Sequence, residues 1–372
     1  MRKESKQNLK LLLFLVLIIL LVVVIFSNST MICEHLEIST DTPPKTDAPS
    51  LTSSLKKTVV NNNIYDKPND PSDYLILITA TCSAYMDWQS LAAYDKIKEI
   101  WPEAAVIRLL HCSMEDRSKY KYENIVPSVY TTDCSVHPRY KDEYPPLNRP
   151  VAVKEFFDQT PLESIKQKWV VIMDSDTLLR KPMNYFPIEK GKPVAQLASI
   201  LMDKMYTACQ YTISSDDSVI RQLPVYDIGS PYILHKEDAK KLAPYWVHFT
   251  NVLRENPHTN DYIGWIVEMY SYIMAAAYLG LDHVVRSDLQ SRWPYTETKE
   301  DVCSYHYDLD QEKDGHKWSK RNYMTELLDT DTLMDLTNCP NEHVRYILTS
   351  INNSLIKWRS KNRTTCYNNQ NV

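Results

Sequence analysis

Glycine is scarce in this chain, with 5 residues among 372. No glycine-rich loop follows the first predicted strand, which argues against a dinucleotide-binding turn and against a P-loop. The 8 cysteines include no Cys-x-x-Cys pair, which argues against a zinc ribbon and against a thioredoxin-like redox site. No internal repeat is evident. These absences leave a chain that resembles neither a nucleotide-cofactor protein nor a structural-zinc protein.

The charge is divided unevenly along the chain. The formal net charge is −5, and residues 1–10 contribute +3 from four bases and one acid, which leaves −8 for the remainder. A nucleic-acid partner requires a basic face. The acidic body therefore argues against a nucleic-acid partner.

Residues 11–26 form an uninterrupted apolar run after this basic start. Sixteen residues are short for a membrane span, which usually needs about 20. A cleaved signal peptide is the alternative, but Val22–Phe26 offers no small-residue cleavage site. We therefore expect an uncleaved signal anchor with a cytosolic tail at 1–10 and a lumenal body. A short span also fits the thinner membranes of the early secretory pathway, in the endoplasmic reticulum or Golgi.

The polar residues 27–72 lack apolar periodicity and predict a flexible lumenal stalk. We expect a catalytic domain over 73–325 and a C-terminal extension over 326–372. Seven of the cysteines follow the stalk, and some of them should be bridged in an oxidising lumen.

The body begins with the pattern of an α/β fold. Tyr74–Ala80 predicts a buried strand, Asp87–Ile100 a helix and Ala104–Leu110 a second strand, which is the start of a Rossmann-like unit. Gly229 before Ser230 and Pro231 predicts a bulge or a close backbone approach within a later strand, and not a regular central strand. The other predicted elements are helices at Val151–Asp158, Lys236–Trp246 and Tyr262–Leu279, and strands at Val194–Ile200 and Val225–Leu234.

The most informative segment is Trp169–Met173, five apolar residues without alternation, followed by Asp174 and Asp176. The run predicts a central parallel strand buried on both faces. Ligands of open α/β sheets bind beyond the carboxyl ends of the strands, and oxygen ligands there suit Mg²⁺ or Mn²⁺. A nucleotide-sugar glycosyltransferase needs such a site, because the charge of its diphosphate leaving group must be neutralised. The simpler interpretation is a capping Asp and a solvated turn.

Other polar residues are predicted to surround the donor. Thr79 lies near the end of the first predicted strand, and Asn148, Arg149 and Lys154 belong to the segment that leads into the Asp-x-Asp strand. These side chains are candidates to hold phosphate or sugar hydroxyls. An ordinary helix cap and solvated cations are the alternative.

A histidine late in the chain completes the predicted metal site. His306 could supply a neutral nitrogen ligand beside Asp174 and Asp176. Lys317 and Lys320 follow as candidates to neutralise a diphosphate. Taken alone, a histidine between two tyrosines is more often a half-buried structural histidine than a ligand.

The helix predicted at Tyr262–Leu279 carries the candidate catalytic carboxylates. Asp261 and Glu268 are seven residues apart, so they would lie on one face and could meet an acceptor. A solvated or ion-paired glutamate is the alternative. The residues expected on the core-facing stripe of this helix are Trp265, Met269, Tyr272, Ile273 and Ala276.

Three segments in this order, Leu147–Pro150, Ile228–Pro231 and Gly264–Tyr270, resemble the plant and algal peptidyl glycosyltransferases that act on serine or hydroxyproline. The resemblance covers about 73–323. It implies a GT-A fold, a UDP-sugar donor, Mn²⁺ (or Mg²⁺) as cofactor, a secreted or membrane polypeptide as acceptor, retention of anomeric configuration and a type II membrane topology.

The sugar that the resemblance implies depends on which branch of these enzymes the chain resembles more. The arabinosyltransferases carry Glu-Pro-Asp where this chain has Asp174-Ser175-Asp176, so this motif, with Arg180 and Pro182 after it, looks nearer the serine α-galactosyltransferases. The Leu147–Pro150 block resembles the arabinosyltransferases more. Galactose and arabinose both stay open.

Two further functions compete with a polypeptide transferase. One is a glycan-extending transferase of the same fold, whose acceptor is a sugar. The other is a catalytically silent, membrane-anchored glycan or protein binder. Intact Asp174, Asp176 and His306 argue against the silent binder.

The topology can be tested directly. If residues 11–26 are a signal anchor, the mature protein should retain Met1 and stay with the membrane fraction after carbonate washing, because an apolar span inserts stably. N-terminal sequencing of the mature chain measures this. Recovery of a soluble secreted form that starts near Ser27 would contradict it.

Overall fold

The computed structural model describes residues 68–137, 141–186, 188–198, 227–292, 302–307, 311–313, 316–324, 327–337 and 342–369. The predicted cytosolic tail and anchor, and nearly all of the predicted stalk, lie outside the described residues. Within the described ranges, no helix combines the length and the apolar character that crossing a bilayer requires.

The centre of the molecule is a mixed seven-stranded sheet with the strand order β3-β2-β1-β4-β7-β6-β8. Its strands are β1 (Tyr74–Thr81), β2 (Ala105–Cys112), β3 (Ser128–Thr132), β4 (Trp169–Asp174), β6 (Val194–Leu197), β7 (Ile228–His235) and β8 (Val284–Arg286). β7 runs antiparallel to both of its neighbours, and the other pairs are parallel. The predicted α/β class is confirmed, and the Asp-x-Asp strand is central, as expected. The prediction that it is a parallel strand holds only on the β1 side, because β7 pairs with it antiparallel.

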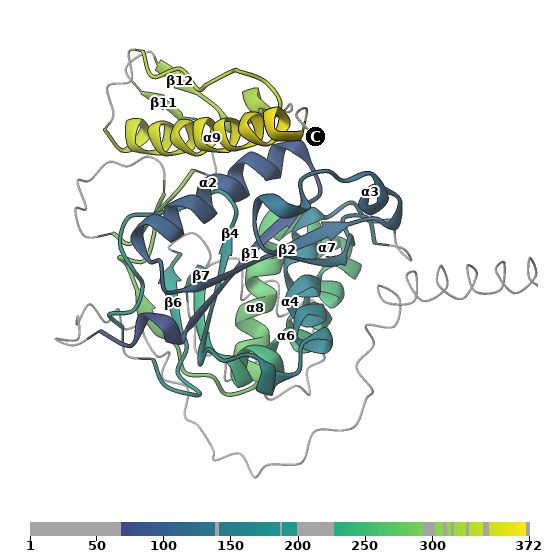
Figure 1. Ribbon diagram of the computed structural model, residues 1–372. Helices are drawn as coiled ribbons and strands as arrows, with labels where there is room; N and C mark the ends of the chain where they lie inside the picture. Colours follow the sequence, from purple (N-terminus) through teal and green to yellow (C-terminus); the bar gives the residue numbers. More distant parts are fainter. Residues whose placement is uncertain are drawn as a thin grey trace, which may run out of the picture.

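Helices cover both faces of this sheet (Figure 1). Alternate residues of β1 divide between two cores, because successive side chains of a strand point to opposite faces. Ile76 and Ile78 pack with α2 (Ala84–Ile100), and Leu75 and Leu77 belong to the core on the other side. The helices of that second core are α4 (Asn148–Gln159), α6 (Lys236–Glu255) and α8 (Val267–Tyr278).

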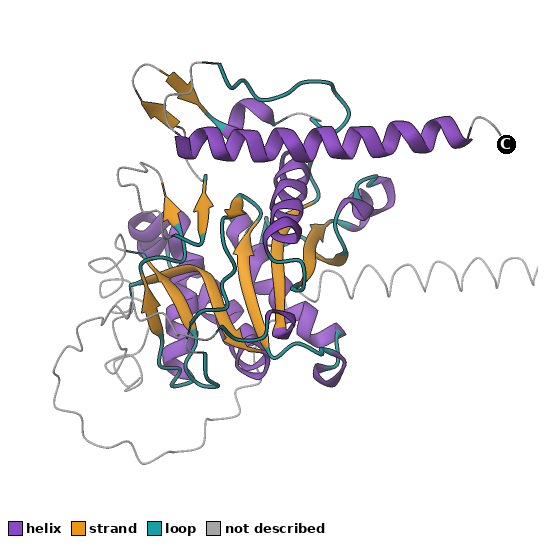
Figure 2. Cartoon of the chain, turned by 60° about the vertical axis from the view of Figure 1, so that its left-hand side comes forward, coloured by secondary structure: helices purple, strands orange, loops and turns teal. Residues whose placement is uncertain are grey.

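A long C-terminal helix adds a further layer outside α2 (Figures 1 and 2). α9 (Glu342–Asn369) places Ile347 and Ile351 in one buried cluster with Trp88 and Leu91 of α2. The segment predicted as a C-terminal extension therefore shares a core with the α/β body.

Most predicted boundaries move by a few residues. Ser83 caps α2, its hydroxyl accepting from the N–H of Met86, so this helix begins three residues before the predicted start. α4 begins three residues before Val151, and α6 continues past Trp246. The remaining short elements are α3 (Met114–Lys119), α7 (Pro257–Ile263), β5 (Thr177–Leu179), β9 (Ser291–Arg292), β10 (Ser304–His306), β11 (Gln311–Lys313) and β12 (His316–Trp318).

The helix predicted over Tyr262–Leu279 is wrong as a single helix. α7 ends at Ile263, a 3₁₀ turn occupies Gly264–Ile266, and α8 begins at Val267. Gly264 has φ 63°, a left-handed backbone that a helix interior does not accept. Asp261 and Glu268 therefore do not share one continuous helix face.

The prediction for Gly229 is confirmed, and a second glycine ends α8. The register of β6 against β7 shifts between Ala195 and Gln196, so β7 contains the predicted irregularity after Gly229. Gly280, with φ 66°, follows the end of α8, and its N–H donates to the Ala277 carbonyl at 3.0 Å.

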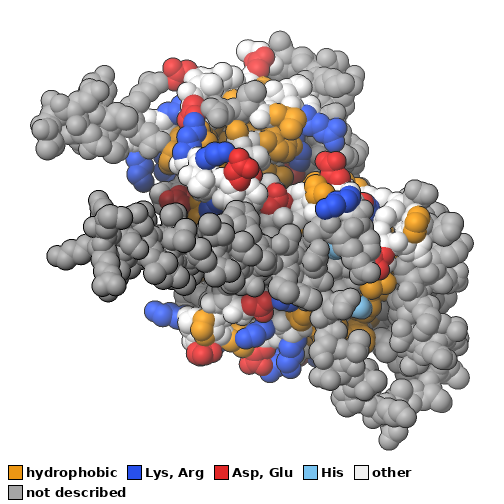
Figure 3. Space-filling view, turned by 90° about the vertical axis from the view of Figure 1, so that its right-hand side faces the viewer, with side chains coloured by type: hydrophobic (Ala, Val, Ile, Leu, Met, Phe, Trp, Pro, Cys, Tyr) orange, Lys and Arg blue, Asp and Glu red, His pale blue; other side chains and the backbone are white. Residues whose placement is uncertain are grey.

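The face seen in Figure 3 carries acidic and basic side chains side by side over its described part. This interspersed pattern gives that part of the surface no extended field of one sign.

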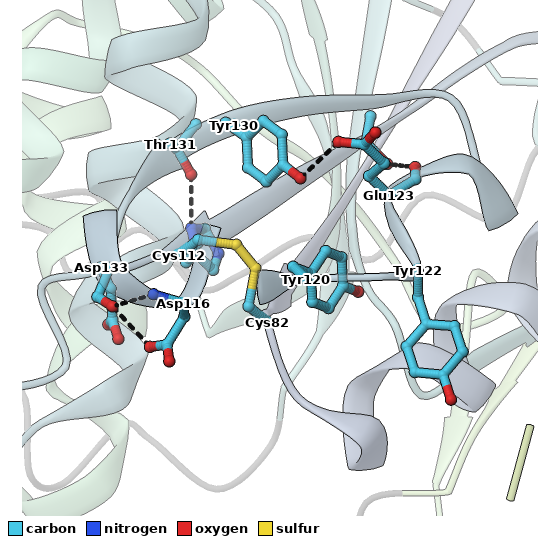
Figure 4. Close-up of a disulfide and its surroundings, with 12 residues drawn as sticks. Cys82, Cys112, Asp116, Tyr120, Tyr122, Glu123, Tyr130, Thr131 and Asp133 are labelled. Atoms are coloured by element: carbon cyan, nitrogen blue, oxygen red, sulfur yellow. Dashed lines mark hydrogen bonds between the residues drawn. A yellow bond between two sulfur atoms is a disulfide. The ribbon is translucent and has the colours of Figure 1, made fainter. Parts of the chain in front are cut away.

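A disulfide joins Cys82, just after β1, to Cys112 at the end of β2 (Figure 4). Thr131 of β3 lies near the disulfide, and its hydroxyl is hydrogen-bonded to Nδ1 of His111, the residue before Cys112, at 2.9 Å. The expectation that some cysteines of the body are bridged is confirmed.

Removing this bridge should destabilise the protein. It closes a loop with a sequence separation of 30, so the double variant Cys82→Ala, Cys112→Ala should lose about 2–4 kcal/mol of unfolding free energy. Chemical denaturation measures the loss. Met114→Ala, at an exposed position two residues after Cys112, is the control and should leave the midpoint unchanged. Equal stability of the double variant and the native protein would show that the bridge contributes nothing.

Candidate active site

The site lies where the sheet reverses its winding. From β1 the chain proceeds to β2 and β3 on one side and then to β4 on the other, so the connections leave β1 in opposite directions. Such a switch point opens a crevice at the carboxyl ends of the two strands. Thr79 and Asp174 are register partners there, and Thr79 is buried. Thr79 thus occupies the predicted edge.

His306 reaches this edge through a second, smaller sheet. β5 continues directly from the Asp-x-Asp turn and pairs antiparallel with β10, which places His306 opposite Thr177. The N–H of Tyr307 donates to the Asp176 carbonyl at 3.1 Å. His306 Nε2 then lies 3.1 Å from Asp176 Oδ1. Backbone pairing therefore joins two segments that lie 130 positions apart.

The three predicted metal ligands come together. One potential ligand atom each from Asp174, Asp176 and His306 lies within 4.8 Å of the other two. Carboxylate oxygens with one imidazole nitrogen form a donor set that accepts Mn²⁺ or Mg²⁺ with water or phosphate oxygens in the remaining positions. The donor set fits the cation, and metal binding itself stays a prediction.

Asp176 is more deeply placed than its position at a strand end indicated. It is buried, and Lys320, also buried, forms an ion pair with it. Burial opposes its ionisation, but the charge of Lys320 and the contact with His306 outweigh burial and hold the pKa of Asp176 well below its usual range. Asp176 is thus enclosed although it lies beyond the end of a strand, because the segment around Lys320 folds over it.

Arg149 connects the Asp-x-Asp turn to Glu268. Its guanidinium forms an ion pair with Asp174 and binds both carboxylate oxygens of Glu268, at 3.2 and 3.1 Å. Glu268 is 3% exposed. Burial raises the pKa of Glu268, and the charge of Arg149 opposes that rise. Glu268 is thus ion-paired, as the alternative interpretation had it, and not solvated. The side chain of Arg149 joins it to the candidate metal site.

The other residues predicted to bind the donor differ in what they contact. Asn148 organises the loop after β3: its Oδ1 accepts from the N–H of Cys134 at 2.6 Å, and its Nδ2 donates to Asp133 and Ser135 at 2.9 Å. Lys154 forms an exposed ion pair with Asp158 at 2.6 Å, and no contact to the cluster is observed for it within the described residues. The side chains of Lys317 and Asp261 lie outside the described residues.

Tyr144 is a site residue that the sequence did not reveal. Its hydroxyl donates to the Trp265 carbonyl at 2.7 Å and accepts from the Glu268 N–H at 2.8 Å. Trp246 Nε1 donates to the Glu268 carbonyl at 2.9 Å. The backbone of Glu268 is therefore fixed from two sides. The only signal in the sequence is the position of Tyr144 three residues before Leu147–Pro150.

A family model described as the hydroxyproline O-arabinosyltransferase family N-terminal domain matches residues 74–285. This range contains the whole central sheet except Arg286, the last residue of β8. It also contains Arg149 and its two partners, Asp174 and Glu268. The chain belongs to this family.

Its relatives include both enzymes that the sequence resembled. The peptidyl serine alpha-galactosyltransferase of Arabidopsis thaliana is 29% identical over 270 residues, which cover 68% of this chain and 32% of the relative. Hydroxyproline O-arabinosyltransferase 3 of Arabidopsis thaliana is 26% identical over 271 residues, 68% of this chain and 70% of the relative. The chain thus spans about a third of the length of the first relative. The resemblance is confirmed.

A solved structure, the WbbM bifunctional glycosyltransferase in its apo form, aligns over 67% of this chain and 47% of its own. The alignment has 13% identity and a TM-score of 0.38.

The contribution of the Asp176–Lys320 ion pair to stability can be measured apart from any role in catalysis. Asp176→Asn should lower the unfolding free energy by about 3 kcal/mol, because it leaves the buried Lys320 cation without its partner. Adding Lys320→Met should restore most of that loss, since the pair is then removed together. Chemical denaturation of the single and double variants measures both effects.

Glu115→Gln is the matched control, because it breaks an exposed ion pair with Lys119 and should change stability by less than about 0.5 kcal/mol. A double variant no more stable than Asp176→Asn would contradict the importance of this pairing.

Proposed function

We propose that this protein is a metal-dependent, retaining glycosyltransferase with a GT-A fold. It moves galactose or arabinose from a UDP-sugar to a serine or hydroxyproline hydroxyl of proteins in the secretory pathway. The observation that carries the proposal is the convergence of Asp174, Asp176 and His306 at the switch point of the sheet. Membership of the hydroxyproline O-arabinosyltransferase family supports the reaction class.

Asp174, Asp176 and His306 would hold Mn²⁺ or Mg²⁺, which supplies positive charge to the departing diphosphate when bound. Lys320 adds a cation at the same place, because it already pairs with Asp176. Thr79, beside Asp174, is placed to meet the donor. Lys154 and Lys317 stay candidates for the outer part of the donor.

The transfer exchanges one bond for another. The bond between the sugar C1 and the β-phosphate oxygen breaks, the acceptor oxygen bonds to C1, and the hydroxyl proton passes to the departing phosphate on the same face. No protein base is required by this balance. The role proposed for Glu268, with Arg149, is to orient the acceptor and to stabilise the transition state, since the pair is buried and adjoins Asp174.

The compartment proposed is the lumen of the Golgi or endoplasmic reticulum. The Cys82–Cys112 disulfide supports it, because such bonds persist in oxidising compartments. The basic start and apolar run at 1–26 supply the proposed type II anchor.

The test uses the purified full-length chain in detergent with UDP-galactose or UDP-arabinose and peptides that carry serine or hydroxyproline. Transfer should require Mn²⁺ and stop in excess chelator, and early NMR of the product should show the donor's anomeric configuration. His306→Ala should raise the Mn²⁺ concentration for half-maximal rate about tenfold or more, since it removes one ligand.

His248→Gln is the control, because His248 lies on α6 away from the cluster. Full activity in chelator would overturn the metal site, and an inverted product would overturn retention. Transfer to glycans alone would favour the glycan-extending function, and turnover of no donor would favour the silent binder.

A further inference from the structure

Trp265 is the most exposed of the large apolar side chains in the described part of the chain, at 67%. The helical pattern placed it on a core stripe with Tyr272 and Ile273, and that expectation is wrong. Gly264 turns the backbone into a 3₁₀ turn, so the indole leaves the stripe, while Tyr272 and Ile273 stay buried. Leaving an indole in water sacrifices burial free energy that an aromatic side chain usually gains.

The indole rests on a built support. Its ring and that of Tyr144 meet edge to face, with centroids 6.1 Å apart, and the Tyr144 hydroxyl holds the Trp265 carbonyl. Arg254 lies 4.1 Å from the centroid of the Tyr144 ring and is fixed by an ion pair with Asp142. An aromatic surface held in this way loses little conformational freedom when it binds a partner.

The same support leads into the active site. The Tyr144 hydroxyl that binds Trp265 also binds the N–H of Glu268, whose carboxylate pairs with Arg149. Arg149 in turn pairs with Asp174 at the donor end. Trp265 therefore lies in the turn just before α8, the helix that carries Glu268. In this series of contacts it stands on the opposite side of Arg149 from the candidate metal ligands.

We propose that Trp265 is an acceptor-binding residue that stacks on a proline or hydroxyproline ring of the polypeptide acceptor. The inference rests on the proposed function, which supplies a polypeptide as the occupant. Pyrrolidine rings present a flat aliphatic face, and proline-rich segments dock on exposed aromatic side chains in a preformed extended conformation. Tyr144 is the positioning residue, because it fixes both Trp265 and Glu268.

The test compares two synthetic peptides that carry the same acceptor residue, flanked by prolines in one and by alanines in the other. Trp265→Ala in the full-length protein should raise KM about tenfold for the proline peptide and leave KM for the alanine peptide and for the UDP-sugar unchanged. Trp265→Phe should recover most of the loss. Tyr144→Phe should raise the proline-peptide KM and lower kcat several-fold, because it frees both backbone groups.

Tyr185→Ala is the matched control, because Tyr185 is also an exposed aromatic residue. The carbonyls on either side of it accept hydrogen bonds from Asn69, which lies just before the start of β1. Tyr185 is therefore at the end of the sheet opposite to the site. Equal effects of Trp265→Ala on both peptides would overturn the proposal. Calorimetry of peptide binding in the presence of UDP and Mn²⁺ distinguishes a failure of this inference from a failure of the proposed function. Trp265-dependent binding of the proline peptide without transfer would refute the proposed function and keep the inference, and transfer that is indifferent to Trp265 would do the reverse.

Discussion

The site depends on the neutralisation of two neighbouring carboxylates at the end of one buried strand. Two unpaired carboxylates, Asp174 and Asp176, would repel each other and would be costly to bury at this end of the sheet. Arg149 forms an ion pair with Asp174, and Lys320 forms one with Asp176. Each cation is delivered by a different part of the chain, Arg149 by α4 and Lys320 by the segment after β12. The pairing therefore holds the sheet, α4 and the C-terminal segment in one arrangement, and it places positive charge where a diphosphate would arrive.

A second set of contacts supports the opposite side of the site. The break at Gly264 separates α7 from α8, and the hydroxyl of Tyr144 spans the resulting turn by binding a carbonyl before it and an N–H after it. Without this partner, the N–H of Glu268 in the first turn of α8 would lose its acceptor. One residue thereby caps a helix, directs Glu268 towards Arg149 and leaves Trp265 in solvent.

The strongest local patterns predicted the elements well. The uninterrupted apolar runs gave β1 and β4 within a residue or two, because a strand buried on both faces requires such a run and little else does. The pattern failed at Tyr262–Leu279, where apolar spacing continued across Gly264 and concealed the break. It also assigned Trp265 to the core, since periodicity records which side chains could be buried and not which ones find a partner.

The sequence by itself determined the α/β class, the central strand, the placement of Asp174 and Asp176 at its carboxyl end and the family, because these depend on local composition and on short motifs. Only the tertiary structure decided that His306 joins them, that Lys320 and Arg149 neutralise them, and that Tyr144 fixes Glu268. Three of those contacts join residues that lie 124 to 144 positions apart. Arg149 and Asp174 are closer in the chain, 25 positions apart by subtraction (174 − 149). Strand pairing and helix packing bring them together, and the apolar periodicity of one segment does not show which distant segment it will contact.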